Sequence, residues 1–154
     1  MKNVILLLLF LLISGCNERE NSKPLMDIEV ELAAIENTRA IFEKAVKEGD
    51  IESIKGLVTK DVKIIGPGSS DWAKMYSTGT NIGPFPYDSI IMSPEETVIV
   101  SDTVAYDFGT SRVFYTDSVG QVMELKDSFL VILKKGNDGV WRLHREVASS
   151  KVLE

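Results

Sequence analysis

Residues 122–149 read VMELKDSFLVILKKGNDGVWRLHREVAS, and this stretch decides the fold. Apolar and polar residues alternate in two runs, Val122–Leu133 and Val140–Ser149. This period of two is typical of β-strands that bury one face. Between the runs, Gly136-Asn137-Asp138-Gly139 is a strong hairpin signal. The stretch therefore predicts two long antiparallel strands at the C-terminal end of the chain.

The strand pattern continues upstream of this hairpin. Val104–Tyr115 is predicted as another long strand, in which Gly109 indicates a bulge or a bend. Ser89–Met92 and Thr97–Val100 are predicted as two short strands that are separated at Pro94, because proline cannot donate to a strand ladder. Tight turns join these segments, so we expect an antiparallel meander that bends.

Helical spacing precedes the strands. In residues 25–48, apolar side chains recur at helical intervals and form one stripe. This stripe consists of Ile28, Leu32, Ile35, Phe42 and Val46. Gly49 is placed to end the helix, and Asp50 is placed to cap a second helix at Ile51–Val58. The segment therefore predicts a long amphipathic helix followed directly by a short one.

A short strand and a third helix are expected next. Val62–Ile65 is predicted as the strand, and Ser69 or Ser70 can cap a helix at Asp71–Thr78. The inner face of this helix would hold Trp72, Met75 and Tyr76. Helices followed by an antiparallel meander indicate an α+β fold. The long first helix would cover the concave face of the curved sheet.

The first sixteen residues have the layout of an export signal. Lys2 supplies a positive start, Val4–Ile13 is an unbroken apolar run, and two small residues precede Cys16, which is the only cysteine. The apolar run is well short of the roughly 20 residues that a membrane-spanning helix needs. Ile13-Ser14-Gly15-Cys16 resembles the lipobox of bacterial lipoproteins, in which the cysteine is lipidated and the signal is cut just before it.

This resemblance implies a division of the chain into three parts. Residues 1–15 would be a lipoprotein signal peptide, residues 16–24 a polar tether that begins at a lipidated Cys16, and residues 25–154 one folded domain. The protein would then be anchored by lipid in the bacterial cell envelope, on the periplasmic side of a membrane or at the cell surface. The alternative is a soluble secreted protein in which Cys16 is incidental.

The charge of the chain narrows the classes of partner. The formal net charge is −6, and it becomes more negative when Lys2 leaves with the signal. An acidic domain gains nothing from a phosphate backbone, so we expect no nucleic-acid partner. The chain has one histidine and no cysteine besides Cys16. We therefore expect no metal site, and no motif indicates a cofactor.

Two short motifs carry a resemblance to a known family. They are Ala45-Val46-Lys47-Glu48-Gly49-Asp50 and Val140-Trp141-Arg142-Leu143-His144, and their order and spacing resemble those of the NTF2-like superfamily, which includes SnoaL-like, ketosteroid-isomerase-like and DUF4440-type domains. The resemblance covers about residues 28–150. It implies a cone in which a curved sheet wraps around helices, with a pocket at the open end. Some members isomerise or cyclise ketones, some hydrolyse small molecules, and many only bind a ligand or dimerise through the sheet.

Two charged side chains interrupt apolar rows on the last two strands. Strand alternation places Asp127 in a row with Phe129 and Val131, and Arg145 in a row with Leu143. Because a buried charge is costly unless it is paired, we expect Asp127 and Arg145 to pair across the hairpin. The pair is either a structural salt bridge or a functional site, in which the carboxylate lines the cone and the arginine orients an anionic ligand group.

Further candidates are His144 and several aromatic residues. His144 is the only side chain that titrates near neutral pH when unperturbed, so it is a candidate general base, although the strand register aims it away from the apolar row. Trp72, Tyr76 and Tyr106 are candidates for the pocket wall, and the alternative is that they belong to the core.

These observations leave three functions open. The leading one is a lipid-anchored domain that binds a small, partly apolar ligand in the cone, without an assigned reaction. The second is a small-molecule isomerase or hydrolase that uses Asp127 or His144. The third is an interaction module in which the outer face of the sheet forms a homodimer. An open cavity that contains the candidate residues would favour the first two, and a filled cone would favour the third.

Overall fold

The computed structural model describes residues 26–80 and 85–152. The predicted signal peptide, Cys16 and the tether lie outside these ranges, and so does the end of the chain. The elements follow the order of the sequence analysis. They are α1 (Ile28–Glu48), α2 (Ile51–Gly56), β1 (Val58–Ile65), α3 (Ser70–Thr78), β2 (Ser89–Ile99), β3 (Val104–Thr116), β4 (Val122–Lys135) and β5 (Trp141–Ser149).

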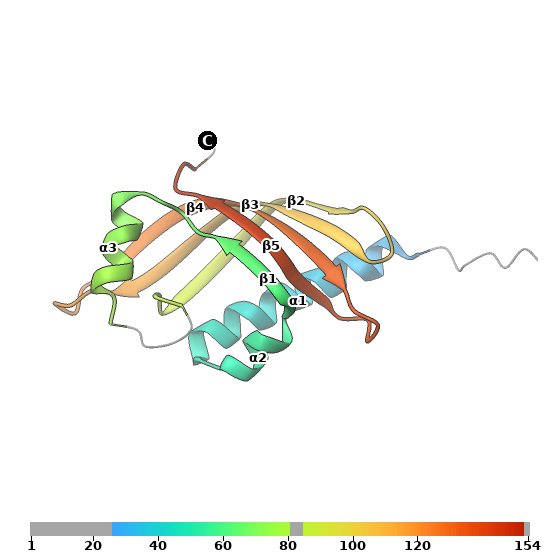
Figure 1. Ribbon diagram of the computed structural model, residues 1–154, viewed down its shortest axis with the longest axis horizontal. Coiled ribbons are helices and arrows are strands. Elements are labelled where there is room, and N and C mark those ends of the chain that lie inside the picture. The colour runs from blue at the N-terminus through green and yellow to red at the C-terminus, as the bar shows by residue number, and fades with distance from the viewer. Residues whose placement is uncertain (1–25, 81–84, 153–154) are drawn as a thin grey trace, which may run out of the picture.

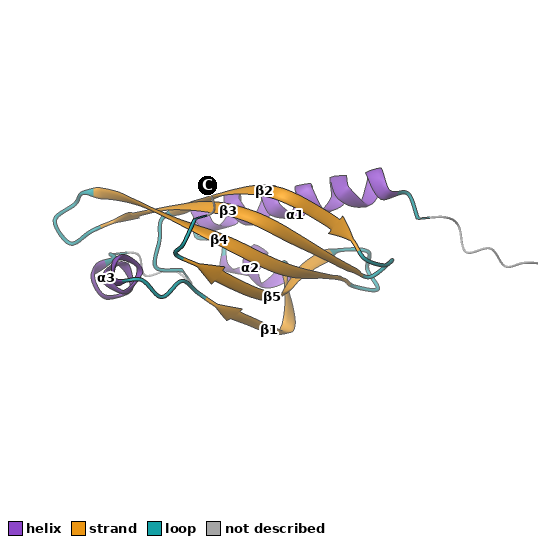
Figure 2. Cartoon of the chain, turned by 90° about the horizontal axis from the view of Figure 1, so that it is seen from above, coloured by secondary structure: helices purple, strands orange, loops and turns teal. Residues whose placement is uncertain are grey.

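The five strands form one curved sheet in the order β1-β5-β4-β3-β2. The strands β2 to β5 form an antiparallel meander, as predicted, whereas β1 pairs in parallel with β5, so the sheet is mixed. The helices α1 and α2 lie on one side of the sheet, and α3 lies beside one end of it (Figure 1). Figure 2 shows the twist of the sheet and the length of α1 behind it. This arrangement confirms the α+β cone.

Capping side chains set the ends of the helices. Asp27 accepts from the first backbone N–H groups of α1, and Gly49 ends this helix in the left-handed region, with φ 67°. Asp50 and Ser69 cap α2 and α3 in the same way. The predicted stripe of α1 starts too early, because Ile28 is 45% exposed. Of the helices in the described ranges, none has the length and apolar character that a membrane crossing requires.

The prediction of two short strands at Pro94 is wrong, because β2 runs through this residue. Pro94 lies opposite Gly109 on β3, and the strand register shifts between Pro94 and Glu96. A bulge therefore accommodates the missing N–H group of proline. A Cβ atom at Gly109 would lie only 2.4 Å from the carbonyl oxygen of Ser93, so the close approach requires glycine.

A second bulge reverses the side-chain pattern of β5. Leu143 lies opposite Leu133 on β4, but the next pair joins Arg145 to Ile132, so His144 is an extra residue. Side chains alternate between the two faces of a strand, and one extra residue exchanges the faces of all that follow. Glu146 consequently lies on the inner face, opposite Val131. Arg145 lies on the outer face.

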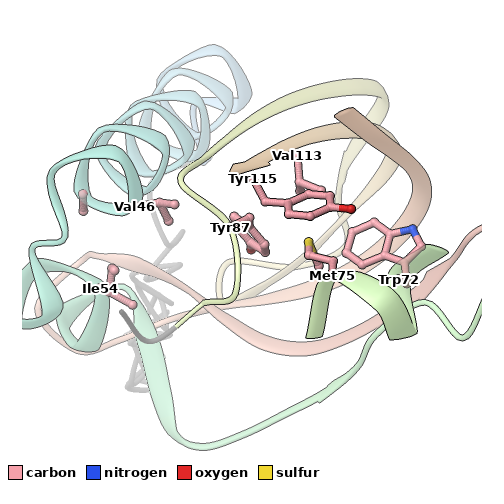
Figure 3. Packing of buried hydrophobic residues seen from close by; sticks show 8 residues of the cluster. Val46, Ile54, Trp72, Met75, Tyr87, Val113 and Tyr115 are labelled. Atoms are coloured by element: carbon pink, nitrogen blue, oxygen red, sulfur yellow. The ribbon is translucent and has the colours of Figure 1, made fainter. Parts of the chain in front are cut away.

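The interior contains two groups of buried apolar residues. One joins Ala45 and Val46 of α1 to the α3 residues Trp72 and Met75, together with Tyr115 of β3. In Figure 3, Trp72 and Met75 point toward Tyr115, and Tyr87 fills the space on the side of Val46. The other surrounds Trp141, whose indole Nε1 donates to Glu31 of α1 at 2.8 Å. The two groups leave a hollow between them.

Candidate functional site

A cavity of about 260 Å³ lies inside the cone. It is enclosed by α1, by α3 and by the inner faces of all five strands. Most of its wall is apolar or aromatic. The apolar and aromatic contributors are Ile35, Phe42, Leu57, Val58, Ile64, Trp72, Tyr76, Phe85, Tyr87, Ile90, Met92, Val113, Phe129, Val131, Leu133 and Leu143. The cone is therefore open inside, as expected for a binding domain and not for a filled interaction module.

The ionisable groups of the wall come from neighbouring positions of three strands and α1. Asp107 on β3 and Glu146 on β5 both pair with Val131 of β4, so these three residues form one row across the sheet. Asp127 on β4 is opposite Ser111 of β3. Asp107 and Asp127 face inward because they keep the alternation of their strands, and Glu146 faces inward because of the bulge at His144. Three carboxylates therefore line one cavity.

Arg39 of α1 neutralises one of these carboxylates. Its Nη2 donates to Oδ2 of Asp107 at 2.8 Å, and its Nη1 donates to Glu36. The other carboxylate oxygen of Asp107 accepts from Oγ1 of Thr97 at 2.6 Å. Arg39 and Asp107 are 94% and 97% buried, respectively. This network satisfies both charges at the helix side of the cavity, because each group has an opposite charge and hydrogen bonds.

Among the described residues, Asp127 has a hydrogen-bond partner but no cation. Its side chain is buried, and it accepts from the hydroxyl group of Ser111. Burial raises the pKa of Asp127, and the hydrogen bonds from Ser111 oppose this effect. The result is an acid that keeps its proton to a higher pH than an exposed aspartate does.

Glu146 is the most perturbed carboxylate in the cavity. No described residue donates a hydrogen bond to its side chain. Burial, together with the charge of Asp127, raises the pKa of Glu146 to about 7. The residue keeps intermediate exposure because it lines the cavity. An unpartnered carboxyl group that titrates near neutral pH can bind a cation or transfer a proton.

The predicted pair of Asp127 and Arg145 does not form. The guanidinium group of Arg145 donates to the backbone oxygen of Asp61 at 2.8 Å, on the outside of the sheet. The prediction is wrong because it carried strict alternation through β5, whereas the bulge at His144 exchanges the two faces. Arg145 therefore cannot orient a ligand in the cavity, and Glu146 occupies the inner position.

Tyr106 also lies outside the cavity, contrary to the prediction. The inward residues of β3 are the odd-numbered ones, such as Ala105 and Asp107, and Tyr106 is on the other face. Its hydroxyl group donates to Glu96 at 3.1 Å. Trp72 and Tyr76 do line the cavity. Trp72 is buried, and Tyr76 lines the cavity while it remains 55% exposed.

His144 contacts the outer residues of β1 and not the cavity. Its Nδ1 lies 3.1 Å from Oγ1 of Thr59 and 3.4 Å from a carboxylate oxygen of Asp61. Burial and the adjacent charge of Arg145 lower the pKa of His144. This ring ties β5 to β1, which favours the structural alternative over the general base.

The sequence carries signals for two of the three charged wall residues that were not predicted. Arg39 lies four residues after Ile35 and three before Phe42, so it falls on the apolar stripe of α1. Asp107 likewise interrupts an alternating row of β3 between Ala105 and Gly109. A charge on an apolar row was the criterion used for Asp127, and it applied equally to these two residues. Glu146 had no such signal, because the bulge determines its face.

No metal site is present in the part of the chain that the structure describes. Within these ranges, no three His, Cys, Asp or Glu side chains come together in a way that could hold a metal ion.

Comparison with solved structures identifies the class of the fold, which is NTF2-like. The chain is similar to a ketosteroid isomerase-like protein from Erwinia carotovora atroseptica, with a TM-score of 0.58 and 22% identity over 77% of this chain and 95% of the other. A conserved protein from Planctomyces limnophilus has a TM-score of 0.62 and 21% identity over 79% and 96%. An NTF2-like superfamily protein from Salmonella enterica has a TM-score of 0.61 and 15% identity over 83% and 95%.

No family model matches the sequence, and no curated protein matches it either. The likeness to solved structures therefore establishes the NTF2-like fold and leaves the activity to be argued from the cavity.

Proposed function

We propose that this domain binds a small, partly apolar molecule inside the cone. The observation that carries the proposal is the cavity of about 260 Å³, which combines apolar walls with a few inward polar groups. Small-molecule sites commonly have this composition, because apolar surface supplies affinity and a few polar groups fix the orientation of the ligand. The ketosteroid isomerase-like neighbour has the same fold, which is compatible with this role.

The two tryptophans of the chain allow a site-specific test. Trp72 lines the cavity, whereas Trp141 packs under α1 in the other buried group. In the full-length protein labelled with ¹⁵N at the indole nitrogens, the neutral probe 1-naphthol should shift the Trp72 signal saturably and leave the Trp141 signal in place. If Trp72 does not respond, the proposal is wrong.

A matched pair of variants checks the location. Val131 lies in the middle of the concave face, and its neighbour Leu130 is 45% exposed on the outer face. Val131→Phe should fill the cavity and abolish the response of Trp72 to 1-naphthol, whereas Leu130→Phe should retain it. An unchanged Trp141 signal reports that each variant is folded. Equal binding by both variants would place the ligand elsewhere.

A second candidate function is proton transfer to or from a bound carbonyl compound. The observation that favours it is Glu146, whose pKa of about 7 suits a general acid or base at neutral pH. A direct assay is the exchange of the α-protons of 2-indanone into D₂O, followed by NMR. Glu146→Gln should lower any exchange that the protein catalyses by about 100-fold or more. Equal exchange by both proteins would exclude this role.

We also propose that the domain works at a bacterial membrane, as a lipoprotein anchored through Cys16. The support is the sequence of residues 1–16, in which a short apolar run ends in two small residues and the cysteine. Stable anchoring needs more than one acyl chain, and lipoproteins of this type carry two or three on the same cysteine. Homodimerisation through the outer face of the sheet stays a prediction.

A further inference from the structure

We propose that the ligand of this cavity is a protonated amine on an apolar body, with its ammonium group bound at the carboxylate of Glu146 and held in the field of Asp127. The inference rests on the proposed function, because it names the chemical class of the molecule that the cone binds. It adds the charge of the ligand to the size and apolar character that the proposed function already gives.

The first argument is the balance of charge in the cavity. Arg39 is the only basic side chain in the wall formed by the described residues. Its charge is engaged, because its two terminal nitrogens donate to Glu36 and Asp107. Asp127 and Glu146 therefore share the cavity without a cation from the described part of the chain. A ligand that brings one positive charge would reduce this imbalance.

The second argument is the supply of hydrogen-bond acceptors. The carboxylate of Asp127 already accepts from Ser111, but that of Glu146 accepts from no described residue. An ionised carboxylate only accepts hydrogen bonds, and an ammonium group only donates them. The two groups form a charge-assisted hydrogen bond, which is stronger than a bond between neutral partners. Glu146 is therefore complementary to an amine.

The third argument is the aromatic wall. Phe42, Phe85 and Tyr87 are in contact, with ring centroids 5.6 Å apart in the first pair and 5.2 Å apart in the second. Trp72 and Tyr76 form another pair, at 6.4 Å. Aromatic faces attract cations and also bury apolar carbon, so this wall suits an amine that carries a hydrocarbon or aromatic body.

Ligands with other charges fit less well. A carboxylate would meet two groups of its own sign in a site with little water. The Nε of Arg39 is a buried donor without a partner in the described part of the chain. This atom is fully covered by protein, so an entering anion would not reach it. A neutral ligand would leave the negative charges of Asp127 and Glu146 without an opposite charge.

The proposal predicts a pH dependence of affinity. The groups that face the cavity around Glu146 are Asp127, the Arg39–Asp107 pair, Tyr76 and Tyr87. Burial raises the pKa of both tyrosines, so they stay neutral at pH 6–8. An aliphatic amine stays protonated over this range. When it binds to protonated Glu146, the carboxyl group loses its proton to solvent, so affinity should rise from pH 6 to pH 8.

The test uses three probes of similar size and the Trp72 signal of the full-length protein. They are 2-phenylethylamine, 2-phenylethanol and phenylacetate. At pH 7.5, the amine should bind at least about tenfold more tightly than the alcohol, and phenylacetate more weakly still. Glu146→Gln should remove this preference and its pH dependence, while the affinity for the alcohol changes little. Glu124→Gln, which removes a charge from the outer face of β4, should behave as the wild type.

Each failure has a distinct meaning. If the alcohol binds as tightly as the amine, or if Glu146→Gln keeps the preference, the amine inference is overturned and the binding function stands. If 1-naphthol shifts the Trp72 signal but none of the three probes does, the amine inference is likewise overturned and the binding function stands. If 1-naphthol also fails, both proposals are overturned.

Discussion

Arg39 and Asp107 form an ion pair inside the cone, with 2.8 Å between Nη2 of the arginine and Oδ2 of the aspartate. The two residues are 68 positions apart in the sequence and join the middle of α1 to the first half of β3. Because both side chains are almost fully buried in the folded state, the loss of one partner would leave the other charge buried and unpaired.

Arg39→Met should therefore destabilise the fold strongly, by about 3–5 kcal/mol, because it leaves Asp107 without its cation. The double variant Arg39→Met/Asp107→Asn should recover part of this loss, since no unpaired charge remains. Urea denaturation measures both free energies of unfolding. The exposed pair of Arg112 and Glu124 provides the control: Arg112→Met should cost at most about 1 kcal/mol. Equal losses at Arg39 and Arg112 would contradict the buried pair.

The raised pKa of Glu146 makes stability depend on pH. Folded Glu146 keeps its proton up to a pKa of about 7, whereas the ordinary value is 4.5. Between these values the folded state binds more protons than the unfolded state, so the free energy of unfolding falls as the pH rises. The total fall from this group is about 3 kcal/mol, mostly between pH 5 and pH 7.

Urea denaturation from pH 5 to pH 8 would test this dependence. Glu146→Gln should remove the fall and be more stable than the wild type at pH 8. The raised pKa of Asp127 also makes the free energy of unfolding fall as the pH rises, but at lower pH. The lowered pKa of His144 has the opposite effect and makes this free energy rise with pH. Both residues are present in the two proteins, so the difference between the curves reports Glu146. Parallel curves would mean that Glu146 titrates normally.

Gly109→Ala should be costly because the backbone of β2 leaves no room for a methyl group. The added Cβ would lie 2.4 Å from the oxygen of Ser93 and 2.6 Å from the Cα of Pro94. We expect a loss of about 1–3 kcal/mol in thermal or urea unfolding. Gly68→Ala is the matched control, since nothing lies within 4 Å of its added Cβ, and it should be neutral or slightly stabilising. If Gly109→Ala left the free energy of unfolding unchanged, β2 would be able to move away from the added methyl group.

Cys16→Ser should release the domain from bacterial membranes, because the hydroxyl group cannot form the thioether that holds the lipid. Cell fractionation followed by detection of the domain measures this change. The same experiment on the unaltered chain should place the domain in the detergent-soluble membrane fraction. If Cys16→Ser stays with the membrane to the same extent, the anchor lies elsewhere and the lipoprotein proposal fails.

Features that depend on neighbouring residues could be predicted from the sequence. The cap residues Asp50 and Ser69, the left-handed Gly49 and the hairpin at Gly136–Gly139 follow from short-range chemistry, and each helix appears close to its predicted bounds. The meander followed from alternation alone. These signals were sufficient for the α+β cone, because the order of the elements leaves few ways to cover the sheet.

Features that depend on distant partners could not be predicted in the same way. The parallel pairing of β1 with β5 joins segments that are far apart in the sequence. The continuity of β2 depends on Gly109, which offers Pro94 the space for a bulge. The inner position of Glu146 depends on the register between β4 and β5. For these reasons the predictions from the sequence were correct for Trp72 and Asp127, which line the cavity, and wrong for Arg145 and Tyr106, which do not.

The extra residue at His144 also has an evolutionary consequence. Inserting one residue between His144 and Arg145, with the bulge kept, would move Arg145 to the position opposite Val131, so a basic side chain would enter the cone where an acidic one now lies. The sheet, the helices and the walls would keep their places. A single codon insertion could thus invert the charge that this scaffold offers to its ligand, and related chains could diverge in what they bind without any change of architecture.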